Sequence, residues 1–222
     1  MLRQLRGAGI AGGVYTQTTD VENEVNGLIT YDRQVQKFPA DDLAAIHAML
    51  MAPPEKMEVL MPIARVKKHD WKYTTEKPAD DWMKSDFDAS GWKTGPGGFG
   101  TAKTPGTTIG TVWDSKDIWV RTDFDYDPSN GKLVLNLHYD EDPIIYINGV
   151  KAAQPEGYTV DYIFSDISPE AQSSLKAGKN TIAIYCKNAF GGQYIDAGLI
   201  YLQQGAAPGE PAGADGATNR LK

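Results

Sequence analysis

The chain has 222 residues, enough for one large domain or for one ordinary domain with extra segments, because single domains cluster near about 100–150 residues. Its 41% hydrophobic and 10% aromatic residues, with 23 Gly and 13 Pro, are typical of a soluble globular protein rich in turns rather than of a disordered chain. The net charge of -7 argues against a nucleic-acid partner, and no apolar run approaches the roughly 20 residues that would cross a membrane.

Residues 1–51 predict a helix, a strand, a loop and a second helix in that order. MLRQLRGAG is typical of the last turns of an amphipathic helix, and GGVYTQTTD of a short strand with a polar end. PADDLAAIHAMLM has apolar residues at helical spacing and is followed by Pro53-Pro54. This order is the repeating unit of an α/β barrel or a doubly wound sheet. Such a piece cannot close a sheet by itself, so its exposed apolar faces are expected to lead to self-association or to refolding of residues 1–51 against the rest of the chain.

Residues 52–70 mix prolines with a short apolar run and predict a linker. Residues 71–203 differ, because short segments of alternating polarity are separated by Asn-Gly and Gly turn signals. This pattern predicts an antiparallel β-sandwich of jelly-roll type. The tail 204–222 has no apolar periodicity and is expected to be disordered.

The polar run that follows the predicted first strand contains the first candidate site. Its members that are expected to contact a ligand are Gln17, Asp20, Glu22 and Asn26. In an α/β barrel the strand ends and their loops form the mouth of the active site. Asp20 and Glu22 could pair for glycoside cleavage, but they are two residues apart on one loop. The alternative is that Asp20 and Asn26 brace the loop by local hydrogen bonds.

The same run, GGVYTQTTDVENEVNGLITYDR, resembles the eighth strand and following loop of the (β/α)₈ barrel in glycoside hydrolase family 2. That family includes β-galactosidases, β-glucuronidases and β-mannosidases, and the resemblance covers about residues 1–50. It implies that residues 1–51 are the end of a catalytic barrel whose two catalytic glutamates precede Met1. The four polar residues would then bind sugar, with no catalytic residue in this chain.

The region from Trp71 onward is similar to the galactose-binding-domain-like sandwiches attached to many glycoside hydrolases. The resemblance is carried by DDWMKSDFDASGWKTGPGGFG, DIWVRTDFDY, IYINGVKAA and LKAGKNTIAIY. Trp92 and Trp113 lie in glycine-rich or loop-like surroundings, which makes them the best candidates for exposed rings that stack on sugar, with packing inside the protein as the alternative for each ring. Trp119 alternates within a strand and is expected in the core.

Other side chains indicate no cofactor. The acidic loops DFDASGW and HYDEDP could hold Ca²⁺, but neither matches the twelve-residue calcium loop, and solvated loops are the expectation. The three histidines are scattered and indicate no metal site. Cys186, the one cysteine, alternates with apolar residues and is expected in the core.

These observations predict a carbohydrate-associated β-sandwich, a non-catalytic carbohydrate-binding module from the C-terminus of a glycoside hydrolase. The expected partner is an oligo- or polysaccharide. One alternative is an enzyme in its own right, which would need Asp20 with Glu22, or Asp140 with Asp196, in one cleft. Another is a purely structural domain with every tryptophan buried. The first residues lack the apolar run of a secretion signal, so a secreted or periplasmic parent enzyme is expected to carry its signal upstream.

Overall fold

The computed structural model describes residues 10–52, 56–102 and 104–203, so the predictions for residues 1–9 and 204–222 lie outside it. The chain divides into two compact units, one that contains the described residues 10–52 and one from Met57 to Gln203. No helix among the described residues is long and apolar enough to cross a membrane. The second unit is mainly β and forms the predicted sandwich.

In the first unit, the predicted second helix is present as α2, Ala40–Met51. It begins after Pro39 and carries Asp41 and Asp42 in its first turn, where acidic groups favour the helix dipole. None of its residues is buried. Residues 13–20 form no regular strand, and the loop around them is held by isolated bridges such as Thr19–Ile29. The expected barrel strand is therefore not formed in this structure, and self-association through this unit stays a prediction.

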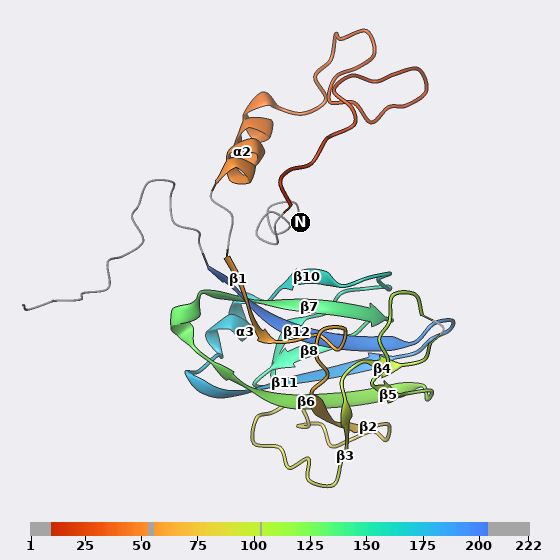
Figure 1. The fold of residues 1–222 in the computed structure, drawn as a ribbon, viewed down its shortest axis with the longest axis vertical. Helices are drawn as coiled ribbons and strands as arrows, with labels where there is room; N and C mark the ends of the chain where they lie inside the picture. The colour runs from red at the N-terminus through yellow and green to blue at the C-terminus, as the bar shows by residue number, and fades with distance from the viewer. Residues whose placement is uncertain (1–9, 53–55, 103, 204–222) are drawn as a thin grey trace, which may run out of the picture. The chain divides into compact units, whose positions relative to one another are not determined.

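The sandwich consists of two six-stranded sheets (Figure 1). Along the strand orders given below, neighbouring strands pair antiparallel except β4 with β5, which are parallel. The first sheet has the order β10-β7-β12-β4-β5, with β1 also paired to β12. Its strands are β1 Lys56–Met61, β4 Phe99–Gly100, β5 Thr111–Val112, β7 Lys132–Asp140, β10 Ile163–Asp166 and β12 Tyr194–Gln203. Strand β1 lies within residues 52–70, so part of the segment expected to be a linker belongs to the sandwich.

The second sheet has the order β3-β2-β6-β11-β8-β9. Its strands are β2 Asp70–Thr74, β3 Lys93–Pro96, β6 Asp117–Tyr126, β8 Ile144–Ile147, β9 Val150–Ala153 and β11 Gly178–Lys187. Two short helices complete the unit: η1, Pro128–Asn130, and α3, Pro169–Ser173. Asn148 and Gly149 both have positive φ, as the tight Asn-Gly turn between β8 and β9 requires.

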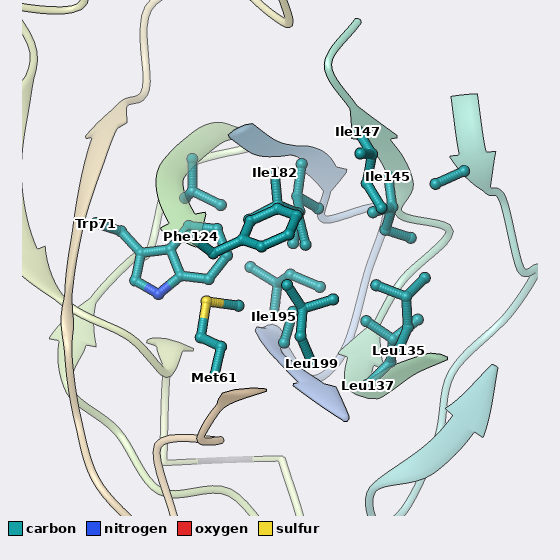
Figure 2. Close-up of a cluster of buried hydrophobic side chains, with 14 of the residues drawn as sticks. Met61, Trp71, Phe124, Leu135, Leu137, Ile145, Ile147, Ile182, Ile195 and Leu199 are labelled. Atoms are coloured by element: carbon teal, nitrogen blue, oxygen red, sulfur yellow. The ribbon is translucent and has the colours of Figure 1, made fainter. Parts of the chain in front are cut away.

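The core lies between the two sheets. Alternate residues of each long strand point inward, as the period-2 pattern predicts. Figure 2 shows Phe124 and Ile182 of the second sheet approaching Leu135 and Leu199 of the first. Cys186 is fully buried, which confirms the prediction that it belongs to the core.

Candidate functional site

The outer face of the second sheet carries a row of side chains that crosses four strands. The register places Trp119 opposite Thr74 on one side and opposite Tyr185 on the other. Tyr185 is in turn opposite Ile144. Because Ile118 and Val120 point into the core, alternation turns Trp119 to the outer face. The row therefore joins β2, β6, β11 and β8 through residues distant in sequence.

Trp119 and Tyr185 form the centre of this row. Their ring centroids are 5.1 Å apart with an interplanar angle of 32°, and both side chains are half-buried. The Tyr185 hydroxyl donates to Asp117 Oδ1 at 2.7 Å. Burial and this hydrogen bond raise the pKa of Tyr185 to about 12, so the phenol stays protonated at neutral pH. The pair presents a fixed aromatic surface beside a carboxylate.

The loop between β2 and β3 forms a wall beside this surface. Trp82 of this loop is buried and meets Tyr146 of β8 edge to face, with ring centroids 5.7 Å apart. Trp92 stacks behind Trp82 at 6.5 Å. The loop therefore packs through aromatic rings that face the outer side of the sheet.

Arg121 of β6 anchors this loop. Its guanidinium donates to the carbonyl oxygens of Trp82 at 2.8 Å and Lys84 at 3.0 Å, and the residue is only 5% exposed. It also lies over the ring of Phe87, 5.4 Å from the ring centroid. Burial lowers the pKa of Arg121 below its ordinary value, yet a guanidinium remains charged at neutral pH. A buried cation thus holds the wall in place.

Replacing Arg121 with methionine is expected to loosen this wall. The substitution keeps much of the apolar volume but leaves the two carbonyls without their donor, a loss of about 1–3 kcal/mol in the free energy of unfolding. Proteolysis should cut near Trp82 before the rest of the sandwich, and mass spectrometry of the fragments would locate the cut. Lys72→Met, on the same face, is the control. Equal protease resistance in both variants and the wild type would contradict the anchoring role.

This wall borders a cleft of about 370 Å³, and the Trp119–Tyr185 surface forms the floor of the cleft. Its lining residues are Lys77, Trp82, Asp117, Trp119, Tyr146 and Tyr185. Four aromatic rings with one ammonium and one carboxylate supply stacking faces and directed hydrogen bonds. Asp117 is the one carboxylate among these lining residues, whereas glycoside hydrolysis uses a pair. The cleft therefore offers a ligand aromatic faces and hydrogen-bonding groups.

The structure corrects the expectations for Trp113 and Trp119, while sugar contact by Trp92 stays a prediction. Trp113 is 1% exposed and lies in the core, so the prediction of an exposed ring there is wrong. Its surroundings are loop-like, but the loop is folded over the sandwich interior. Trp92 is half-buried and contacts Trp82 and Phe87, so it supports the wall. Trp119 was expected in the core, but it faces outward. The alternation in DIWVRTDFDY places Trp119 on the opposite face of the strand from Ile118 and Val120, which are in the core.

The polar run of the first unit is bound largely to itself. Asp20 is 6% exposed and its Oδ1 accepts from Gly27 N at 2.8 Å and Lys37 Nζ at 2.6 Å. The hydrogen bond from Lys37 lowers the pKa of Asp20. Gln17 Nε2 donates to Asn26 Oδ1 at 3.3 Å. These contacts match the bracing alternative for Asp20, while sugar binding at the rim stays a prediction.

Glu22 is exposed and has a φ of 51°. This left-handed conformation turns the backbone between Val21 and Glu24, whose backbone groups bond to each other at 2.9 and 3.2 Å. Glu22 and Asp20 therefore have different surroundings, one in solvent and one buried. Within the described residues 10–52, no cleft brings these two carboxylates together.

The two acids of the sandwich also lie in different surroundings. Asp140 lines a cleft of about 390 Å³ at the end of β7 and accepts from Thr104 Oγ1 at 3.3 Å. Asp196 lies on β12, 3% exposed, where Oδ2 accepts from Ala64 N and the Tyr162 hydroxyl. The structure thus does not present them as a catalytic pair in one cleft. In the described part of the chain, no three His, Cys, Asp or Glu side chains gather to hold a metal ion.

No protein-family model and no curated protein matches this chain. Among solved structures, it is similar to a glycosyl hydrolase family 2 member from Bacteroides cellulosilyticus, with 17% identity, a TM-score of 0.42, and coverage of 59% of this chain and 20% of that one. A β-glucuronidase from Bacteroides uniformis has 17% identity and a TM-score of 0.45, with coverage of 66% and 18%. A β-glycosidase from Bacteroides vulgatus has 15% identity and a TM-score of 0.41, with coverage of 65% and 20%. The chain spans about a fifth of the length of these structures.

Proposed function

We propose that the sandwich is a non-catalytic carbohydrate-binding module whose site is the cleft above Trp119 and Tyr185. The observation that carries the proposal is this pair of half-buried rings on a sheet face, with Asp117 held beside them at hydrogen-bond distance from Tyr185. A pyranose offers an apolar C–H face and a rim of hydroxyl groups. The two rings stack on the apolar C–H face, and the Asp117 carboxylate and the Lys77 ammonium form hydrogen bonds with the hydroxyl groups.

The pre-formed shape of the cleft favours binding. The wall is fixed by Arg121 and by ring contacts, and Tyr185 is fixed by Asp117, so little side-chain entropy is lost when a ligand enters. Lys77 is exposed and free to adapt to the ligand. An arrangement of rigid rings with an adaptable polar rim is suited to a neutral sugar, whose recognition needs shape and hydrogen bonds rather than net charge.

Affinity electrophoresis and a glycan array with the purified chain test this function, with chromogenic β-glycosides as the activity control. Binding without turnover is the expected result. Turnover would overthrow the non-catalytic assignment and direct attention to an overlooked carboxylate pair. If no glycan bound in any of these assays, the result would favour the alternative that the sandwich is a structural accessory domain.

The Trp119→Ala substitution should remove most of the binding. Truncation of a central aromatic anchor costs roughly 2 kcal/mol or more, a loss of about 30-fold in affinity. Because Trp119 is only half-buried, the fold should be retained, which circular dichroism would verify. Isothermal titration calorimetry with a glycan from the array measures the loss.

Phe190→Ala is the matched control for that substitution. Phe190 is 79% exposed and lines the cleft that contains Asp140, away from the aromatic row. It is expected to keep wild-type affinity. If Phe190→Ala lost binding while Trp119→Ala kept it, the cleft at the end of β7 would be the site and the proposal would be wrong.

We further propose that the parent protein is a glycoside hydrolase, in which Gln17, Asp20, Glu22 and Asn26 lie at the rim of the sugar site. The support is the sequence resemblance of residues 12–33, together with the complete lack of buried residues in α2. The apolar side chains Ile46 and Met49 of that helix are each 59% exposed. A helix with apolar side chains in solvent is expected to pack against further protein.

A further inference from the structure

The ring of Tyr185 lines two clefts rather than one. One is the aromatic cleft described above, which Trp119 also lines, and the other is a cleft of about 520 Å³, which Ile144 also lines; Trp119 and Ile144 are the partners of Tyr185 on the two neighbouring strands. The residues that line the second cleft are Asp142, Ile144, Gln154, Pro155, Glu156, Gly157, Tyr185 and Lys187. Tyr185 is thus a shared boundary, and a ligand that stacks on it can extend to both sides.

We infer that the two clefts form one groove for an extended neutral oligosaccharide, with Tyr185 between its two halves. This inference rests on the proposed function, because it assigns the length and class of ligand to the same site. It predicts recognition of several consecutive sugar units, not of one terminal sugar. The second cleft would hold the part of the glycan beyond the Trp119–Tyr185 floor.

The strand register supports a groove of this length. Trp119, Tyr185 and Ile144 are consecutive partners across β6, β11 and β8, and Thr74 of β2 continues the row. The cleft-lining residues of this row lie on three strands, β6, β11 and β8, and three strands spaced about 4.8 Å apart span roughly 10 Å, which is more than one pyranose ring covers. Ile144 is half-buried and outward-facing, so the apolar floor continues past Tyr185 into the second cleft.

The second cleft also has a fixed wall. Asp142 accepts from Gly157 N through Oδ1, and its own backbone N–H donates to Gly157 O at 3.0 Å. Its other carboxylate oxygen is 3.7 Å from Lys187 Nζ. These contacts tie the loop after β9 to the loop before β8. Gln154 and Glu156 of the tied loop are exposed and offer groups that hydrogen-bond to hydroxyls.

The charges of the combined groove favour a neutral chain. The first cleft contributes Lys77 and Asp117, and the second contributes Lys187 with Asp142 and Glu156. Charges of both signs alternate with neutral groups, and Lys187 is already compensated by Asp142. A strongly anionic or cationic glycan would meet a like charge in each half. A neutral chain meets hydrogen-bonding groups without that cost.

Calorimetry with cello-, xylo- and manno-oligosaccharides of one to six units tests the inference. For the series that binds, affinity should rise about 10-fold or more from one unit to four and then level off, as each added contact contributes. Ile144→Glu should reduce the affinity for the tetrasaccharide to that for the disaccharide, while the disaccharide affinity stays within about twofold of wild type. Ile163→Glu, the same change on the first sheet, should match wild type throughout.

The outcomes separate the two proposals. Affinity that is complete with one unit, or an Ile144→Glu variant with an unchanged length dependence, would overturn the extended groove and leave the aromatic cleft standing. Failure of every series to bind would overturn the extended groove for these chains, and failure on the glycan array as well would overturn the proposed function. Gln154→Ala provides a second variant because Gln154 is exposed and its loss should not affect folding; it should weaken only the longer ligands, and an unchanged tetrasaccharide affinity would count against the inference.

Discussion

The Trp113→Ala variant is expected to lose about 3–5 kcal/mol in the free energy of unfolding, the range for truncation of a buried aromatic side chain. Trp113 is 1% exposed and belongs to the core between the sheets. Its indole N–H donates to Ser115 Oγ at 3.1 Å, so the ring satisfies its one polar atom inside the fold. The cavity left by alanine cannot be filled without movement of both sheets. Urea unfolding followed by circular dichroism measures the loss.

The same variant separates a structural role from a binding role. Because Trp113 does not line the aromatic cleft, the folded fraction of Trp113→Ala should bind glycan with wild-type affinity. Trp113→Phe keeps most of the apolar volume and should lose less stability. A stable Trp113→Ala protein with strongly reduced glycan affinity would contradict the core assignment and restore the binding role expected from the sequence.

A second large effect is expected from pH, through Asp196. This carboxyl lies beneath Ala64 and Tyr162, and both donate to its Oδ2 at 2.7 Å. The Tyr162 hydroxyl also meets that of Tyr194 at 3.1 Å. Burial outweighs these hydrogen bonds and raises the pKa of Asp196 to about 6. The folded chain therefore holds a proton at pH values at which the unfolded chain has released it.

The direction of the pH effect follows from proton linkage. Between the ordinary pKa of 3.8 and the folded value of about 6, the native state binds more protons than the unfolded state, so stability falls as pH rises. The contribution of Asp196 is present in full below pH 3.8 and is lost above about 6. The loss is on the order of 3 kcal/mol.

Asp196→Asn measures this contribution, because asparagine does not titrate and keeps an oxygen that accepts hydrogen bonds. The difference in unfolding free energy between wild type and variant should change by that amount from pH 4 to pH 7, in favour of the variant at the higher pH. The neighbouring groups that could titrate or carry charge are Arg65, His138, Asp161, Tyr162 and Tyr194. They are common to both proteins, so their contributions cancel in the difference. Parallel pH profiles would contradict a raised pKa at Asp196.

The long strands could be predicted from the sequence because their pattern is local. The segments DIWVRTDFDY, KLVLNLHYD and YIDAGLIYLQ coincide with β6, β7 and β12. Alternating polarity indicates that β6 has one face in the core, and the short, largely apolar segments of β7 and β12 are typical of strands buried on both faces. The tight turn at Asn148–Gly149 and the burial of Cys186 follow from equally local signals. Likewise, α2 begins and ends at the signals of its own sequence.

Which side chains form the candidate site depends on the tertiary structure. Trp119 lies in a segment of alternating polarity, where a core position was expected. In the folded sheet Ile118 and Val120 point into the core, so Trp119 between them points outward. The sequence around Trp113 is typical of a loop, yet that loop covers the interior of the sandwich and the Trp113 side chain is buried. The cleft joins side chains of β6, β8 and β11 with a loop that precedes β3, and cross-strand register is a long-range property that no local pattern contains. Sequence alone therefore determined the sandwich and its strands, whereas packing determined which aromatic faces remain open, because each strand has two faces and only the assembled sheets show which one is covered.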